Sequence, residues 1–416
     1  MARARLFKNA SVLAGPELRY VRDADIAVSN DTFEYVGPSG SRPRPAPGRD
    51  ADDADAAPST HDCTGLLVIP GLVNCHTHVG DSVGKDARLE GTVDHKIHPV
   101  FGLKSKILSE TPPGVLVDFM ANSCSSMVRS GTTTFVDFRE GGVEGVELLR
   151  RALSRVPIRC VIMGRTNHYS DEDGIRRNAP LSVSGEDELG DVMRSCDGLG
   201  VSGANENSDA MLERYSRCDA LRAIHASETA ESVSRSEQMT GVSETVRALG
   251  LRPHFLVHMT HASKGDLAAV AGSPGVRGIV VCPRANAALA EGMPDITSMR
   301  RLSNRRLALG TDNVMVNTPD MFREMDYTWK AAMGMDRARV DPAEILRMAT
   351  VNAGMILGRK IGQVAPGMLA DCVFLDKHAI DLEPVHNPYA AVVHRASASS
   401  IRAVMIGGRV VHGSLD

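Results

Sequence analysis

The stretch Val68-Ile69-Pro70-Gly71-Leu72-Val73-Asn74-Cys75-His76-Thr77-His78 decides the fold class of this chain. Its Pro-Gly step interrupts an apolar run, which indicates a strand that enters from a different structural layer. Residues two apart on a strand point to the same side, so His76 and His78 direct their imidazoles towards one point. Two neutral imidazoles that converge at a strand end form half of a divalent transition-metal site. The alternative is two ordinary polar residues at a strand terminus, so the rest of the chain has to supply the other half.

The bulk composition is that of an ordinary globular protein with room for more than one domain. Its 416 residues suit a barrel domain together with a smaller one. The formal net charge of −4 indicates neither a nucleic-acid surface nor an anionic-membrane patch. No stretch approaches the roughly 18 consecutive apolar residues of a membrane span, and the N-terminus has no apolar region of the signal-peptide kind. We therefore expect no nucleic-acid or membrane partner; the small-molecule substrate that we expect follows from the active-site residues described below.

The cysteines point to the cellular setting. Eight of them are scattered along the chain without a Cys-x-x-Cys motif. Several lie inside apolar runs, where cysteine behaves as a small buried hydrophobic residue. This usage predicts a reduced, cytoplasmic protein.

Both ends of the chain show the alternating pattern of antiparallel β-structure. Short alternating runs occupy residues 1 to 37, and the pattern returns beyond Gly362, with Gly407-Gly408 as a hairpin turn. Residues 38–62 are rich in Pro, Gly, Ser and Asp, which indicates a solvated loop. We expect the two ends to pair, so that residues 1–65 and 363–416 form one composite β-sandwich domain.

From residue 66 to residue 362 the pattern changes to strands that alternate with helices. Eight strands with intervening helices are typical of a (β/α)8 TIM barrel, an α/β fold. Asp341 as N-cap and Gly358 as terminator predict one last helix. The first candidate strand ends near His78, and the other seven are Thr133–Asp137, Ile158–Met163, Leu199–Ser202, Leu221–His225, Phe255–His258, Gly278–Cys282 and Leu307–Gly310.

The polar residues at the strand ends supply the missing half of the metal site. In a (β/α)8 barrel the catalytic groups sit at the C-terminal ends of the strands. His225 ends the fifth strand, His258 the sixth and Asp312 the eighth, each after an apolar run. Together with the first pair they favour a metal-binding active site. His261 is an alternative to His258, although the apolar run ends at Val257 and favours His258.

Across essentially its whole length the chain resembles the amidohydrolase superfamily. The motifs that carry the resemblance include Pro70–His78, Gly131–Thr134, His225–Glu228 and Gly310–Asn313. Within the superfamily the chain looks most like the mononuclear aminohydrolases related to cytosine, guanine and adenosyl-homocysteine deaminases, because Cys282-Pro283-Arg284-Ala285-Asn286 is similar to a Cys-Pro-x-Ser-Asn segment of that group.

The resemblance implies a role for each matching residue. His76, His78, His225 and Asp312 would bind one divalent metal, for which three imidazoles and a carboxylate favour Zn²⁺, with Fe²⁺ or Mn²⁺ as alternatives. Catalysis would fall to Asp312 as proton acceptor from the attacking water and to Glu228 and His258 in proton transfer and substrate polarisation. Glu228 reaches the site only if the chain has left the strand by Ser227, and its alternative role is an acid at the start of the next helix.

The substrate pocket departs from the family pattern, because the loop after the first strand lacks the Arg-Gly and acidic, Trp-containing segment of many relatives. The leading hypothesis is hydrolytic deamination of an amino-substituted heterocycle. The alternatives are hydrolysis of a cyclic amide or imidazolone ring and, from another class, a non-catalytic scaffold. The resemblance also implies a homo-oligomer. The candidate substrate contacts are Asp81, His95, His98 and Asn286.

Overall fold

The computed structural model describes residues 4–41, 59–87, 91–336 and 339–415 and divides into two compact units. The first unit takes in the described residues of 1–73, 127–133 and 341–416, and the second those of 74–126 and 134–340. These limits differ from the domain boundaries expected at residues 65/66 and 362/363. At the first boundary the reason is that β5 (Leu66–Pro70) pairs with strands of both chain ends. The acidic part of the expected loop at 38–62 lies outside the described residues.

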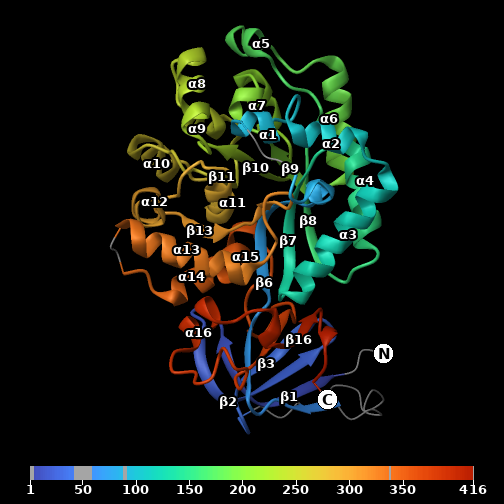
Figure 1. Cartoon of the computed structure of the whole chain (residues 1–416), viewed down its shortest axis with the longest axis vertical. Coiled ribbons are helices and arrows are strands. Elements are labelled where there is room, and N and C mark those ends of the chain that lie inside the picture. Colours follow the sequence, from blue (N-terminus) through green and yellow to red (C-terminus); the bar gives the residue numbers. More distant parts are fainter. Residues whose placement is uncertain (1–3, 42–58, 88–90, 337–338, 416) are drawn as a thin grey trace. The chain divides into compact units, whose positions relative to one another are not determined.

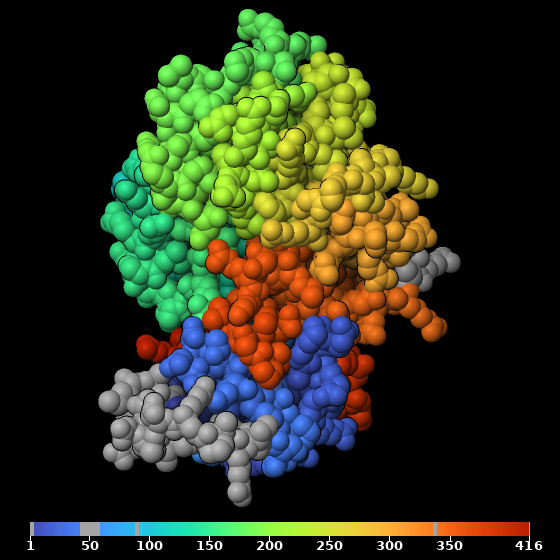
Figure 2. Space-filling model, turned by 180° about the vertical axis from the view of Figure 1, so that it is seen from behind, coloured from blue at the N-terminus to red at the C-terminus, as the bar shows by residue number. Residues whose placement is uncertain are grey.

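In the first unit one mixed sheet joins the two ends of the chain (Figure 1). Its strand order is β17-β16-β15-β5-β1-β2-β3, with β4 paired to β1, and Figure 2 shows N-terminal blue beside C-terminal orange and red. Phe7, Phe33 and Phe374 are buried in its core. The expected pairing of the two ends is confirmed. The strands are β1 (Arg5–Ala14), β2 (Arg19–Ser29), β3 (Thr32–Pro38), β4 (Ser59–Asp62), β5, β15 (Cys372–Asp376), β16 (Ile401–Ile406) and β17 (Arg409–Gly413).

The helices of the first unit correct one prediction. The single helix expected between Asp341 and Gly358 is two helices, α14 (Pro342–Met348) and α15 (Val351–Leu357). Asp341 caps the first, as expected, and Gly358 ends the second in a left-handed conformation. The interruption lies at Thr350, whose backbone leaves the helical region. A third helix, α16 (Pro388–His394), precedes the last hairpin.

The second unit is built on a sheet of parallel strands in the order β13-β12-β11-β10-β9-β8-β7-β6-β14. The stretch 306–313 supplies both ends of this order, because its first half pairs with β12 and its second half with β6. The sheet therefore curls until its last strand meets its first. The strands are β6 (Leu72–His78), β7 (Thr132–Arg139), β8 (Arg159–Gly164), β9 (Gly198–Val201), β10 (Leu221–Ala226), β11 (Phe255–His258), β12 (Gly278–Val281), β13 (Arg306–Leu309) and β14 (Asp312–Asn313).

Helices separate these strands and cover the sheet (Figure 1). Every residue of β6, β7, β11 and β12 is buried, as expected for parallel strands that are covered on both faces. None of the described helices is long and apolar enough to cross a membrane. The helices are α1 (Val93–Ile97), α2 (Leu103–Glu110), α3 (Pro113–Arg129), α4 (Gly142–Leu153), α5 (Glu172–Arg176), α6 (Val183–Ser195), α7 (Asp209–Ser216), α8 (Ala230–Thr240), α9 (Glu244–Ala248), α10 (Lys264–Ala271), α11 (Pro283–Ala288), α12 (Ile296–Ser303) and α13 (Met321–Asp336).

Candidate active site

The two histidines of β6 face the end of the last strand. Both are buried, and Asp312 Oδ1 lies 3.1 Å from His76 Nε2 and 3.5 Å from His78 Nε2. Gly310 makes this approach feasible, because a Cβ added there would lie 2.6 Å from His76 Cβ. The curling of the sheet thus brings residues that are more than 230 positions apart in the sequence into direct contact.

His225 at the end of β10 completes the cluster. Its Nε2 lies 3.4 Å from His78 Nε2. One donor atom from each of His76, His78 and His225 lies within 4.8 Å of the others, and the same holds for His76, His258 and Asp312. The structure therefore brings together the four residues expected to bind a metal and places His258 beside them.

Hydrogen bonds on the far side of the rings orient two of the imidazoles. His78 Nδ1 lies 3.0 Å from the carbonyl oxygen of Phe138 and 2.7 Å from Glu140 Oε1, and His225 Nδ1 lies 3.0 Å from the carbonyl oxygen of Val201. A ring nitrogen that faces these acceptors carries the proton and donates it. The Nε2 atoms then present lone pairs to the cluster, as in metal sites whose histidine ligands are held from behind.

Burial sets the charge state of the cluster. It lowers the pKa of His76 to about 3 and holds the pKa of His225 well below its ordinary value, so both rings are neutral at pH 7. Burial alone would raise the pKa of Asp312, but the hydrogen bond with His76 holds it below its ordinary value. Neutral imidazoles beside a carboxylate are the protonation states that a divalent metal requires.

The buried polar atoms also fit a metal. Within the described residues, Asp312 Oδ2, His258 Nε2 and His76 Nδ1 are buried and have no hydrogen-bond partner. Each such atom costs about 1–3 kcal/mol when nothing satisfies it, so three in one cluster call for an ion or water there. Three imidazole nitrogens and one carboxylate form a donor set that suits a divalent transition metal.

Glu228 and His258 face each other beside the cluster. His258 Nε2 lies 3.6 Å from Glu228 Oε2, and His258 Nδ1 lies 3.4 Å from Asn286 Oδ1. Glu228 is only 14% exposed, and burial raises its pKa to about 7. A carboxyl group with that pKa can both accept and donate a proton near neutral pH. Asn286 also donates to Thr260 Oγ1 at 2.9 Å, so both ends of its amide contact neighbouring side chains.

The backbone is left-handed at three positions of the site. Ser227 has φ 47°, His258 φ 71° and Asp312 φ 60°. Such conformations of non-glycine residues cost of order 1–3 kcal/mol and concentrate at functional sites. At Ser227 the turn has a visible consequence, because it brings Glu228 to the same side as His225.

The expected substrate contacts have different surroundings. Asp81 is buried and accepts hydrogen bonds from Asn313 Nδ2 at 2.8 Å and Met315 N at 3.0 Å, so its two oxygens hold the end of β14 and the loop that follows. His95 is exposed at the start of α1, with Nδ1 3.1 Å from Thr92 Oγ1. Of these three loop residues, the cavity that contains the cluster is lined only by His98. The polar atoms of Asp81 and His95 engage neighbouring groups of the chain, and contact of either residue with a substrate stays a prediction.

His261, the alternative to His258, is turned towards another loop. Its Nε2 lies 2.7 Å from the carbonyl oxygen of Glu291, whereas His258 lines the cavity of the cluster. The end of the apolar run at Val257 therefore selected the histidine that the structure places at the site.

Two joined hollows lie at this end of the sheet. A cavity of about 100 Å³ contains the cluster, and a neighbouring one of about 400 Å³ extends between α2, α3 and the loop after β7. Five residues line both: Ile97, His98, Pro99, Lys104 and Arg165. The larger hollow has the size of a ligand pocket, which gives a substrate room beyond the reacting group.

Several acidic residues of the site were missed from the sequence. Glu206 and Glu244 line the smaller cavity, and Glu140 contacts His78. Burial, with the charges of Glu244 and Asp94, raises the pKa of Glu206 to about 7. Burial alone would raise the pKa of Glu140 as well, but Lys104 and its other cationic neighbours hold it well below its usual value. Glu140 could have been predicted, because it is a polar residue directly after the strand β7, like the other residues of the site.

Comparison with known proteins identifies the family. The model of the amidohydrolase family matches residues 67–411. The chain belongs to the amidohydrolase family. A relative from Methanothermobacter thermautotrophicus with a provisional aminohydrolase name is 36% identical over 411 residues, which cover 97% of this amidohydrolase and 98% of that protein. The expected resemblance is therefore confirmed.

Two further relatives carry deaminase names. The 5-methylthioadenosine/S-adenosylhomocysteine deaminase of Pelotomaculum thermopropionicum is 29% identical to this amidohydrolase over 440 residues, or 98% of this chain and 92% of that one. The zinc-bound crystal structure of an adenosine deaminase from Xanthomonas campestris has a TM-score of 0.79 at 24% identity, covering 97% and 92%. The second likeness shows a shared fold. This amidohydrolase is a hydrolase that acts on C–N bonds, and its cluster of histidines and Asp312 suits a divalent metal.

Proposed function

We propose that this amidohydrolase removes an amino group from a heterocycle by hydrolysis and releases ammonia. The observation that carries the proposal is the pair Glu228 and His258, which face each other beside the cluster of metal-ligating residues. Deamination needs a group that takes a proton from water and gives one to the leaving amine, and a carboxyl with a pKa near 7 meets this need. The deaminase names of the relatives support the same reaction.

The metal belongs to this proposal. His76, His78, His225 and Asp312 would hold one divalent ion, which we take to be zinc because of the three imidazoles and the carboxylate. When bound, such an ion polarises the attacking water and lowers its pKa. Asp312 contributes a second function, because its free Oδ2 can accept a proton from the water.

Glu228 and His258 then complete the proton transfers. A C–O bond forms at the carbon that bears the amino group, and a proton reaches the adjacent ring nitrogen through Glu228. The C–N bond breaks when the amino group receives the second proton of the attacking water and leaves as ammonia, while the new C–O bond becomes a carbonyl. His258, whose Nε2 lies 3.6 Å from Glu228 Oε2 and whose Nδ1 faces Asn286, would take part in proton transfer and in polarising the substrate beside that carboxyl group.

A panel of amino-heterocycles tests the proposal. Zinc-loaded protein is incubated with cytosine, guanine, adenine nucleosides and amino-pterins, and both ammonia release and ring opening are recorded. Ammonia from at least one compound, absent with Asp312→Ala, is the expected result. Ring opening without ammonia would identify a cyclic amide or imidazolone hydrolase instead. If the metal-loaded protein released no ammonia and opened no ring with any compound of the panel, the proposed deamination would be overturned.

Finer features of the molecule are part of the same proposal. We take the curled sheet to be a closed (β/α)8 barrel within residues 66–362, because the stretch 306–313 pairs with both neighbours. The sheet of residues 1–65 and 363–416 would fold over as a β-sandwich. A homo-oligomer and a cytoplasmic location remain predictions. The eight cysteines all lie in the described part of the chain as free thiols, which supports the reduced setting.

A further inference from the structure

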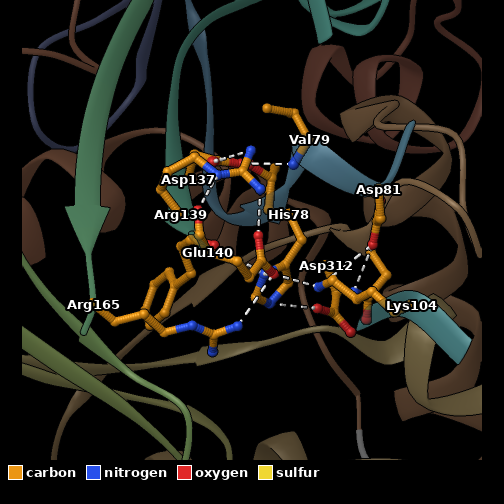
Figure 3. Close-up of polar contacts among 12 residues, drawn as sticks. His78, Val79, Asp81, Lys104, Asp137, Arg139, Glu140, Arg165 and Asp312 are labelled. Carbon is orange, nitrogen blue, oxygen red and sulfur yellow. Dashed lines mark hydrogen bonds and ion pairs between the residues drawn. The ribbon is translucent and has the colours of Figure 1, made fainter. Parts of the chain in front are cut away.

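A group of buried charges surrounds Glu140 on the far side of His78 from the cluster (Figure 3). Glu140 Oε1 lies 2.7 Å from His78 Nδ1 and 2.5 Å from Lys104 Nζ, and Glu140 Oε2 lies 2.5 Å from Arg139 Nη2. Arg165 Nη2 is 3.4 Å away. One carboxylate thus meets three cations and one imidazole.

The cations around Glu140 are buried, which is energetically costly for a charge that has no partner. The side chains of Lys104, Arg139 and Arg165 are 6%, 4% and 9% exposed. Charges removed from water are tolerated only when they are paired and hydrogen-bonded. The three cations therefore keep Glu140 anionic and fix both of its oxygens in position.

The anionic carboxylate distinguishes His78 from the other oriented ligand. The Nδ1 atoms of His78 and His225 both face a backbone carbonyl oxygen, at 3.0 Å in each case. Among the described residues, Glu140 adds a carboxylate at His78 Nδ1, whereas the Nδ1 of His225 faces the carbonyl oxygen alone, and a carboxylate is the stronger acceptor. An imidazole that donates to a carboxylate becomes a more basic metal ligand and is held in one tautomer.

We propose that Glu140 is a positioning residue that fixes the Nδ1–H tautomer of His78 and strengthens its Nε2 as a metal ligand, with Lys104 and Arg139 holding the carboxylate in place. This inference rests on the proposed metal site. It assigns a function to Arg139, the last residue of β7, and to Glu140, which follows it, and deamination chemistry alone requires neither.

The dissociation constant for Zn²⁺, measured by competition with a chromophoric chelator, tests the inference. Glu140→Gln keeps the size and an acceptor oxygen but removes the charge, and we expect zinc binding about 10–100-fold weaker. Glu144→Gln is the matched control, because Glu144 is exposed, lines the same larger hollow and lies four residues away. It should change the constant less than threefold.

Substitution of Glu140 by the shorter acid Asp distinguishes the effect of the charge on zinc affinity from the effect of packing. Glu140→Asp disturbs the packing more than Gln does but restores the charge, so positioning by charge predicts affinities in the order wild type, Asp, Gln. The order wild type, Gln, Asp, or a Gln variant within threefold of wild type, would overturn the inference. If wild type itself bound no zinc, the proposed metal site would fail first, which is a different result.

Loss of the carboxylate leaves buried cations unpaired, so a second variant guards against misfolding. If Glu140→Gln does not fold, Glu140→Gln/Lys104→Met removes one cation together with the anion. The paired variant should fold, as shown by a cooperative thermal transition, and should bind zinc about 10–100-fold more weakly than Lys104→Met alone. Equal affinities of the paired and single variants would refute a role of Glu140.

Discussion

Glu206 makes the stability of this amidohydrolase depend on pH. Burial, the like charge of Glu244 and that of Asp94 raise its pKa from 4.5 to about 7. A carboxyl group with a raised pKa holds its proton more tightly in the folded state than in the unfolded state. Ionising Glu206 in the folded state therefore costs stability. This cost is absent below pH 4.5, grows as the pH rises towards 7, and is constant above that value. The full shift corresponds to about 3 kcal/mol, at about 1.4 kcal/mol for each pKa unit.

Glu206→Gln removes this penalty and should stabilise the protein only at higher pH. Unfolding entropy scales with chain length, and for 416 residues a change of 3 kcal/mol moves the midpoint by about 4 °C. The assay is thermal unfolding of chelator-treated wild type and variant from pH 4.5 to pH 8.5. The midpoint difference should widen by about that amount in favour of the variant.

The exposed residue Glu213 supplies the control for this experiment. Glu213→Gln removes one exposed ion pair and should change the midpoint far less than Glu206→Gln does at high pH. A Glu206→Gln difference that is independent of pH, or that favours wild type at high pH, would refute the claim that Glu206 is ionised at a cost.

Three further substitutions probe the site. Asp312→Asn keeps the shape of the side chain but loses the proton acceptor, so kcat should fall about 10²–10⁴-fold while the far-UV circular dichroism stays unchanged. Phe138→Ala removes a buried ring whose centroid lies 4.4 Å from that of His76, and urea unfolding should show a loss of about 3–5 kcal/mol. Gly80→Ala places a Cβ 1.8 Å from Arg139 Nη2, and displacement of that buried guanidinium should cost about 1–3 kcal/mol in the same assay. Full activity of Asp312→Asn, or wild-type stability of either other variant, would contradict the contacts described.

The cluster was predictable because its members end apolar runs that form strands. His76, His225, His258 and Asp312 each follow such a run, and parallel strands that curl into one sheet carry their C-terminal ends to a common edge. Strand periodicity and strand order were sufficient for this inference. The position of Glu228 depends in addition on the left-handed turn at Ser227. The sequence indicates this turn only because the apolar pattern of the strand stops there.

The site residues that were not predicted from the sequence reach the site through tertiary packing. Lys104 reaches Glu140 from α2, and Glu244 lies on α9, so neither follows a strand of the sheet. Their side chains reach the site because helices pack over the strand ends. The periodicity of the sequence does not predict such contacts. For the same reason Asp81, next to the ligand pair in sequence, was expected at the substrate but holds Asn313.

The central claim is that His76, His78, His225 and Asp312 hold one divalent metal on which C–N hydrolysis depends. Metal-free protein titrated with Zn²⁺, with the initial rate of ammonia release as the readout, tests it most directly. We predict no release without metal, a linear rise, and a plateau at one equivalent per chain. Full activity without metal, or a plateau only at two equivalents, would contradict the claim.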